Sequence, residues 1–122
     1  MSEFKPANAV IWVEIPVSDL DKSMTFYGAV LQSKLTMQEM VPNPTAVFSY
    51  TEGGVGGHLY VGKPGMAETG STVHFAVSAP LEAGLERVKS AGGQVVSDIV
   101  AIPDGRFAYC LDLDGNSFGL FV

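Results

Sequence analysis

Few side chains in this 122-residue chain are of the types that do chemistry. Its only histidines are His58 and His74, and imidazole serves both as a metal ligand and as a proton carrier near neutral pH. Glu14 lies within the mostly apolar stretch AVIWVEIPV, where a carboxylate is a candidate general base. The single cysteine, Cys110, lies in the apolar run FAYCL, so we expect a buried thiol that packs as a small hydrophobic group.

The first half of the chain predicts a strand, a helix and three further strands. Residues 9–17 alternate as a half-buried strand would, which places Trp12 and Glu14 on one face. Ser18-Asp19 is a natural helix N-cap. It precedes six apolar residues at helical spacing: Leu20, Met24, Phe26, Tyr27, Val30 and Leu31. The predicted strands that follow cover 35–41, 45–51 and 58–61, separated by the turn sequences PNP and GGVGG.

The second half repeats this order after a linker over 62–70 that is rich in glycine and small polar residues. A strand over 72–77 leads to a helix that begins near Pro80 and ends at Gly92-Gly93. Its apolar stripe consists of Leu81, Leu85 and Val88. Strands are predicted over 94–102, 106–112 and 117–122. The sequence therefore predicts one α+β domain over 1–122, with two tandem β-α-β-β-β modules at about 8–62 and 71–122 and a hinge-like linker between them.

Composition excludes several classes of partner. A hydrophobic content of 47% is enough to build a core without a disulfide. The net charge of −6, with only seven Lys and Arg, argues against a nucleic-acid partner, because phosphate binding needs clustered cations. No signal peptide and no apolar run of about 20 residues is present, so we expect no membrane partner and a cytoplasmic location.

The two ends of the chain resemble one protein family. The segment VIWVEIPVSDLDKSMTFYGAVL resembles the opening module of glyoxalase-like vicinal-oxygen-chelate (VOC) proteins, in which a strand leads into V-x-D-L-x-x-S-x-x-FY. The runs AGGQVV and DGRFAYCLDLDGNSFGLF resemble the closing signature of the same superfamily, which includes glyoxalases, bleomycin resistance proteins and dioxygenases. The resemblance extends to a subgroup of predicted enzymes related to lactoylglutathione lyase. It implies a concave mixed sheet and a homodimer, with the modules paired within one chain or swapped between chains.

The resemblance also implies four metal-ligand positions, one on the first and one on the last strand of each module. In this sequence they are Trp12, His58, His74 and Gly119, and the first and last of these cannot bind a metal. His58 and His74 with Glu14 could form an incomplete two-His, one-carboxylate set for Zn, Ni, Mn or Fe, although the carboxylate would lie about 6 to 7 Å from the usual position. The alternative is that both histidines are neutral and hydrogen-bonded in a polar cavity.

The same strand faces predict a small-molecule cavity. Its walls would be Trp12, Glu14, His58, Tyr60, His74 and Phe121. Glu14 is the candidate catalytic base, or else makes a structural hydrogen bond, and the other five would contact the ligand or simply fill the space. Tyr109 is a further candidate whose face depends on the strand register.

Two functions remain open from the sequence. One is a small-molecule isomerase, lyase or transferase of the glyoxalase-like kind, and the other is a metal-free protein that binds or sequesters a small molecule, as bleomycin resistance proteins do. Two other sequence motifs support neither of these functions. The segment DLDGN predicts a hairpin turn, because the chain ends before the glutamate of a calcium loop, and GGVGG predicts a tight turn with close backbone approach.

Overall fold

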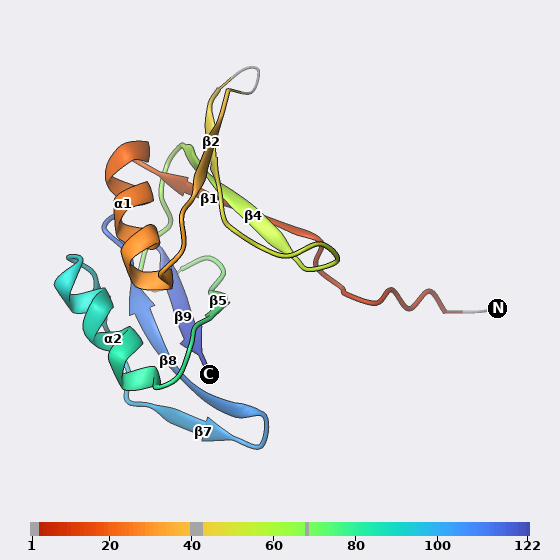
Figure 1. Cartoon of the computed structure of the whole chain (residues 1–122), viewed down its shortest axis with the longest axis vertical. Coiled ribbons are helices and arrows are strands. Elements are labelled where there is room, and N and C mark those ends of the chain that lie inside the picture. The colour runs from red at the N-terminus through yellow and green to blue at the C-terminus, as the bar shows by residue number, and fades with distance from the viewer. Residues whose placement is uncertain (1–2, 40–42, 68) are drawn as a thin grey trace.

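The computed structural model describes residues 3–39, 43–67 and 69–122 (Figure 1). Its elements, in chain order, are β1 (Trp12–Val17), α1 (Leu20–Leu31), β2 (Thr36–Gln38), β3 (Thr45–Val47), β4 (Gly56–Val61), β5 (Val73–Ala76), α2 (Leu81–Ser90), β6 (Gln94–Val95), β7 (Val100–Ile102), β8 (Gly105–Leu111) and β9 (Ser117–Phe121). One sheet has the strand order β1-β4-β3-β2, and the other has the order β5-β9-β8-β6 with β7 also paired to β8. The predicted α+β fold with a two-fold repeat of modules is therefore confirmed.

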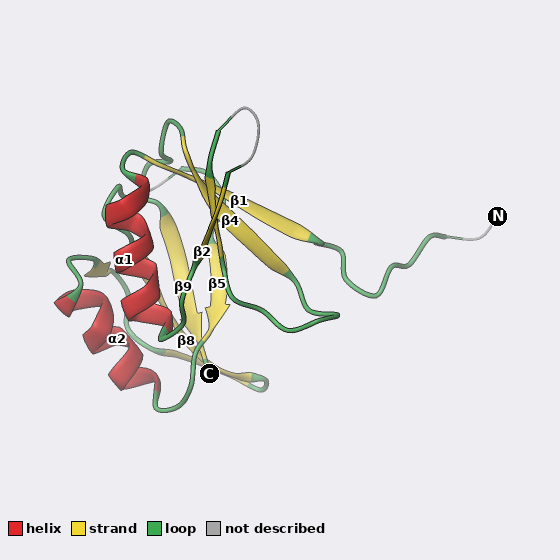
Figure 2. Cartoon of the chain, turned by 45° about the horizontal axis from the view of Figure 1, so that its top comes forward, coloured by secondary structure: helices red, strands yellow, loops and turns green. Residues whose placement is uncertain are grey.

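The strands form two mixed sheets, where the sequence analysis predicted one concave sheet. In each module the first strand pairs in parallel with the last, β1 with β4 and β5 with β9. No backbone ladder joins β1 to β5 among the described residues, so each of these strands keeps an open edge. Figures 1 and 2 show α1 and α2 side by side at one side of the molecule, and this helix contact joins the modules.

Both helices bury the faces that the sequence predicted. Asp19 caps α1, since its carboxylate accepts the backbone N–H of Lys22 at 3.0 Å. Within the predicted stripe of α1, Met24 and Leu31 pack partly buried against the core, and the others are buried. All three predicted apolar residues of α2 are buried in the same core. Neither helix in the described part of the chain has the length and apolar character needed to cross a membrane.

The strand predicted over 94–102 is in fact two short strands, β6 and β7. The side-chain hydroxyl of Ser97 accepts the backbone N–H of Tyr109 at 2.8 Å, a bond that a strand carbonyl would otherwise make. The ladder on β8 is therefore interrupted between β6 and β7. A serine at this place in an apolar run was the only signal of the break.

The ends of the other strands shift by a few residues. β1 begins at Trp12 rather than at residue 9, and residues 3–11 lead away from the body of the molecule (Figure 1). β4 starts earlier than predicted, at Gly56, and so includes part of the glycine loop. A Cβ at Gly57 would collide with the backbone carbonyl of Val13, so glycine lets β4 lie close to β1. Part of the strand predicted over 35–41 lies outside the described residues.

A buried carboxylate joins the two modules. Asp112, in the turn after β8, is 5% exposed, and it accepts hydrogen bonds from Tyr27 Oη on α1 at 2.7 Å and from Asn116 Nδ2 at 3.0 Å. It also accepts two backbone N–H groups of its own turn. Asn116 in turn donates to the Pro16 carbonyl at the end of β1 and accepts the backbone N–H of Gly65 in the linker. The DLDGN segment is thus a hairpin turn, as predicted, and the side chains of Asp112 and Asn116 make their hydrogen bonds within the protein.

The thiol of Cys110 is buried within the core, as the sequence predicted. Burial raises the pKa of the Cys110 thiol from its ordinary value of 9.0 to about 11. We therefore expect the folded protein not to react with a disulfide reagent such as DTNB at pH 8, because the reacting thiolate is neither formed nor accessible. Unfolding in guanidinium chloride should release one reactive thiol per chain. Fast labelling of the native protein would contradict the buried location.

Candidate functional site

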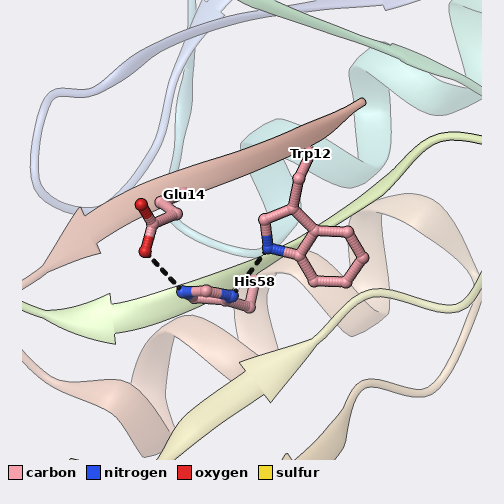
Figure 3. Close-up of polar contacts among 3 residues, drawn as sticks. All are labelled: Trp12, Glu14 and His58. Atoms are coloured by element: carbon pink, nitrogen blue, oxygen red, sulfur yellow. Dashed lines mark hydrogen bonds and ion pairs between the residues drawn. The ribbon is translucent and has the colours of Figure 1, made fainter. Parts of the chain in front are cut away.

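Three side chains form a hydrogen-bonded cluster on the outer face of the first sheet. β1 and β4 run parallel with Glu14 opposite His58, and Figure 3 shows Trp12 and Glu14 reaching from β1 toward the imidazole. Trp12 Nε1 donates to His58 Nδ1 at 2.9 Å. His58 Nε2 lies 3.1 Å from Glu14 Oε1. The parallel register of two neighbouring strands therefore brings together three of the predicted site residues.

The hydrogen bonds fix the state of the imidazole. An indole N–H can only donate, so Nδ1 of His58 must be the unprotonated acceptor. The ring proton then lies on Nε2 and is donated to the Glu14 carboxylate. The side chain of His58 is 13% exposed, whereas that of Glu14 is 65% exposed. The cluster thus presents a carboxylate to solvent and keeps a neutral imidazole behind it.

Aromatic rings surround this cluster. Tyr60, the next outward residue on β4, has its ring 6.1 Å from that of His58. Tyr50 packs edge-on against Trp12 with a centroid distance of 5.7 Å. Sequence analysis had predicted Tyr60 as a wall but missed Tyr50, because Tyr50 lies after the end of β3 and alternation carries no information there.

The outer face of the second sheet carries a separate aromatic group around His74. The His74 ring contacts Phe107 at 5.3 Å and Tyr109 at 5.6 Å, and Phe121 stacks on Phe107 at 6.0 Å. The register opposes Tyr109 to Gly119, which places Tyr109 on the His74 face and settles what the sequence left open. The sequence analysis did not predict Phe107, two residues before Tyr109, because the register of this strand was unknown there as well.

Gly119 is required by this arrangement. It lies opposite His74 in the β5–β9 ladder, and a Cβ at this position would collide with the imidazole Nδ1 and Cε1. The resemblance assigned a metal ligand to position 119, but the ring of His74 fills the space that a side chain at this position would need. A glutamate could stand there only if His74 moved.

The six predicted wall residues are thus divided between two sheets. Trp12, Glu14, His58 and Tyr60 lie on the first sheet, and His74 and Phe121 lie on the second. No hydrogen bond, ion pair or ring contact joins the two groups in the part of the chain that the structure describes. The six residues that the sequence assigned to one cavity therefore form two groups on two separate sheets, and we call these groups the half-sites of the candidate site.

The donor set does not fit a metal centre. A metal ion needs the lone pair of an imidazole nitrogen, but Nδ1 of His58 accepts the indole proton and Nε2 carries its own proton. Within the described residues, no group of three or more His, Cys, Asp and Glu side chains is placed to hold a metal ion. His58 and His74, the two predicted ligands, belong to different sheets.

Two hollows border the half-sites. One, of about 250 Å³, lies between β1 and the linker, and its lining includes Glu14, Thr69 and Ser117. The larger, of about 540 Å³, lies between the modules beside the open edge of β5, and is mostly apolar. It includes His74 but none of the Trp12 cluster, and Val13 and Phe75 contribute side chains from the opposite face of each sheet. The larger hollow therefore adjoins the cluster through Tyr50, but none of the three hydrogen-bonded side chains lines it.

Comparisons with known proteins agree with this architecture. The family model described as Glyoxalase/Bleomycin resistance protein/Dioxygenase superfamily matches residues 9–120. A glyoxalase/bleomycin resistance protein from Albidiferax ferrireducens T118 superposes with a TM-score of 0.74 at 21% identity, covering 93% of this chain and 98% of that one. The genomically encoded fosfomycin resistance protein FosX of Listeria monocytogenes gives a TM-score of 0.72 at 18% identity, covering 96% and 91%. At these identities the likeness shows the fold.

A glyoxalase/bleomycin resistance protein from a Streptomyces species gives a TM-score of 0.69 at 22% identity, and covers 92% of this chain and 98% of that one. A search of curated protein sequences found no match. The chemistry of the two half-sites must therefore be argued from their own residues.

Proposed function

Because the chain belongs to the Glyoxalase/Bleomycin resistance protein/Dioxygenase superfamily, we propose that it binds a small, flat, cationic molecule without the help of a metal ion. The observation that carries this proposal is the bonding of His58, both of whose nitrogens are already engaged by Trp12 and Glu14. The histidine supports the carboxylate, and the carboxylate with its aromatic surroundings binds the ligand.

Charge supports a cationic ligand. The strand registers place one charged side chain, Glu14, on the outward face of β1 and β4, and none on the outward faces of β5, β8 and β9. Most of the other large side chains on these faces are aromatic, and aromatic faces attract cations. The net charge of −6 would add a weak attraction at long range. An anionic ligand would meet one carboxylate and no compensating cation there.

We also propose that the protein is a homodimer in which the first sheet of one protomer meets the second sheet of its partner. The open edges of β1 and β5 support this assembly, because unpaired strand edges readily pair with another chain. Ile11, just before β1, and Trp12, its first residue, expose 81% and 39% of their surface. Such a dimer would bring the Trp12 cluster of one subunit opposite His74 of the partner subunit and complete two sites.

One observation favours catalysis as a second candidate. Glu14 Oε2 has no hydrogen-bond partner in the described part of the chain, while Oε1 is held by His58. A carboxylate with one oxygen oriented and one free is suited to take a proton from a bound substrate. The protein would then be an isomerase or lyase with Glu14 as its base.

The proposal is tested by titrating the purified protein with ethidium, a flat aromatic cation, and with 8-anilinonaphthalene-1-sulfonate, an aromatic anion. Trp12 is the only tryptophan, so its fluorescence reports the first half-site directly. We expect ethidium to bind and the anion not to compete. Glu14→Gln should weaken ethidium about tenfold, because it removes the one charge on the face.

The matched control is Glu39→Gln, which neutralises an exposed carboxylate elsewhere on the first module and should leave affinity unchanged. An equal loss of ethidium affinity in both variants would mean that only the net charge matters, and it would contradict a site at Glu14. Stronger binding of the anion than of ethidium would contradict a cation site altogether. Recovery of a chemically altered ligand after incubation would support the catalytic candidate instead.

A further inference from the structure

We propose that Trp12 is a positioning residue, whose indole N–H fixes His58 as the neutral Nε2–H tautomer and so holds Glu14 as the acceptor of the site. This inference rests on the proposed function for its consequence. Its structural part stands on the geometry of the three side chains. The ring of Trp12 is also a wall of the half-site, so the N–H and the ring must be separated by experiment.

The geometry gives the three groups one consistent polarity. Trp12 donates to His58 at 2.9 Å, and His58 donates to Glu14 from its other nitrogen over 3.1 Å. Reversing the imidazole tautomer would set two N–H groups against each other at the Trp12 contact and would leave an unprotonated nitrogen facing a carboxylate. Both ends of the chain of hydrogen bonds therefore select the same tautomer.

The orientation has a chemical consequence for Glu14. The carboxylate is 65% exposed and would otherwise rotate freely. Its bond to His58 holds Oε1 and directs the second oxygen away from the imidazole. Because Trp12 occupies Nδ1, the imidazole offers no lone pair to a ligand or to a metal ion. The indole N–H thus favours a ligand that is a hydrogen-bond donor or a cation, and it disfavours a metal ion bound to His58.

The test is a nitrogen NMR measurement on the intact, uniformly 15N-labelled protein at neutral pH without ligand. A hydrogen bond between two nitrogens gives a scalar coupling across it, and the single tryptophan makes the assignment direct. We expect a coupling between Trp12 Nε1 and His58 Nδ1, with the ring proton of His58 on Nε2. His74, which the described structure places only in ring contacts, is the internal reference and should show no such coupling.

Substitutions then separate positioning from packing. Trp12→Phe keeps an aromatic ring but removes the donor, so it should abolish the coupling and weaken ethidium binding about three- to tenfold, measured by calorimetry because the variant has no tryptophan fluorescence. A glutamine at position 58 can accept from an indole with its oxygen and donate to a carboxylate with its nitrogen. We therefore expect His58→Gln to stay within about threefold of wild type, and His58→Ala to lose about tenfold.

The two proposals fail separately. A protonated Nδ1 on His58, or no coupling to Trp12 in the wild-type protein, would overturn the positioning role whatever the protein binds. Equal losses in His58→Gln and His58→Ala would overturn it as well. A clear coupling in a protein that binds no ethidium would leave the positioning geometry in place and contradict the proposed ligand class.

Discussion

Replacing Asp112 with alanine should lower the free energy of unfolding by about 3 to 4 kcal/mol. The carboxylate accepts four hydrogen bonds in the core, and two of them come from Tyr27 on α1 and from the side chain of Asn116. Their donors would be left buried without an acceptor, which costs more than the net value of the bonds themselves. Asp112 also links the second module to the first, so its loss should weaken the packing between modules.

Urea or guanidinium unfolding followed by circular dichroism measures this loss. The matched control is Asp104→Ala, which removes the same charge from an exposed turn, where the described structure gives the side chain no hydrogen bond. The control should change stability by less than about 0.5 kcal/mol. A small effect at Asp112, equal to that at Asp104, would mean that the carboxylate does not hold the modules together.

The same carboxylate affects the response to alkaline pH. Burial, and then the charge of Asp112, raises the pKa of the Tyr27 hydroxyl well above its ordinary value of 10.0. A phenol whose pKa is raised by folding contributes stability that is complete below about pH 10 and is lost as the pH rises through the folded-state pKa. Burial of the Cys110 thiol acts in the same direction from about pH 9 upward. Both groups therefore make the folded state less stable in alkaline solution.

The sequence predicted the elements whose pattern is local. The stripe on α1 and the cap at Asp19 depend only on spacing along one helix, and both are present. The break at Ser97 was missed because it depends on which hydroxyl reaches the backbone of a strand twelve residues away. The sequence also could not predict whether β1 and β5 pair within one chain, because the side chains of these strands do not determine which strand pairs with their open edges.

Most residues of the candidate site were predicted from the sequence, but Tyr50, Phe107 and the arrangement of the side chains were not. Alternation placed Trp12 with Glu14, and the family resemblance placed His58 in the same site, opposite Glu14 in the observed register. Nothing in the residue types indicated that the indole would donate to the imidazole, because that bond depends on the parallel register of β1 and β4. Nor could spacing show that Gly119 makes room for His74. The sequence therefore predicted most members of the candidate site, and their contacts with one another depend on the tertiary structure.

Two variants that each bind poorly should recover tight binding when they are combined in one dimer. Glu14→Lys places a cation where the proposed site needs an anion, and should lose at least about tenfold in ethidium affinity. Gly119→Ala places a methyl group where the ring of His74 lies, and because His74 is exposed its side chain turns away, which displaces the imidazole from its face. Each variant alone forms a dimer with two defective sites.

Co-expression distinguishes the two dimer modes, because the lesions lie on different sheets. If sites form between the first sheet of one subunit and the second sheet of the other, a hybrid dimer carries both changes in one site and neither in its second site. Calorimetry should then show a wild-type affinity at one site per hybrid. The matched control combines Glu14→Lys with His58→Ala, which lie on the same sheet and cannot complement each other. If each site forms within one chain, both combinations stay defective, because every site in the hybrid then keeps one lesion.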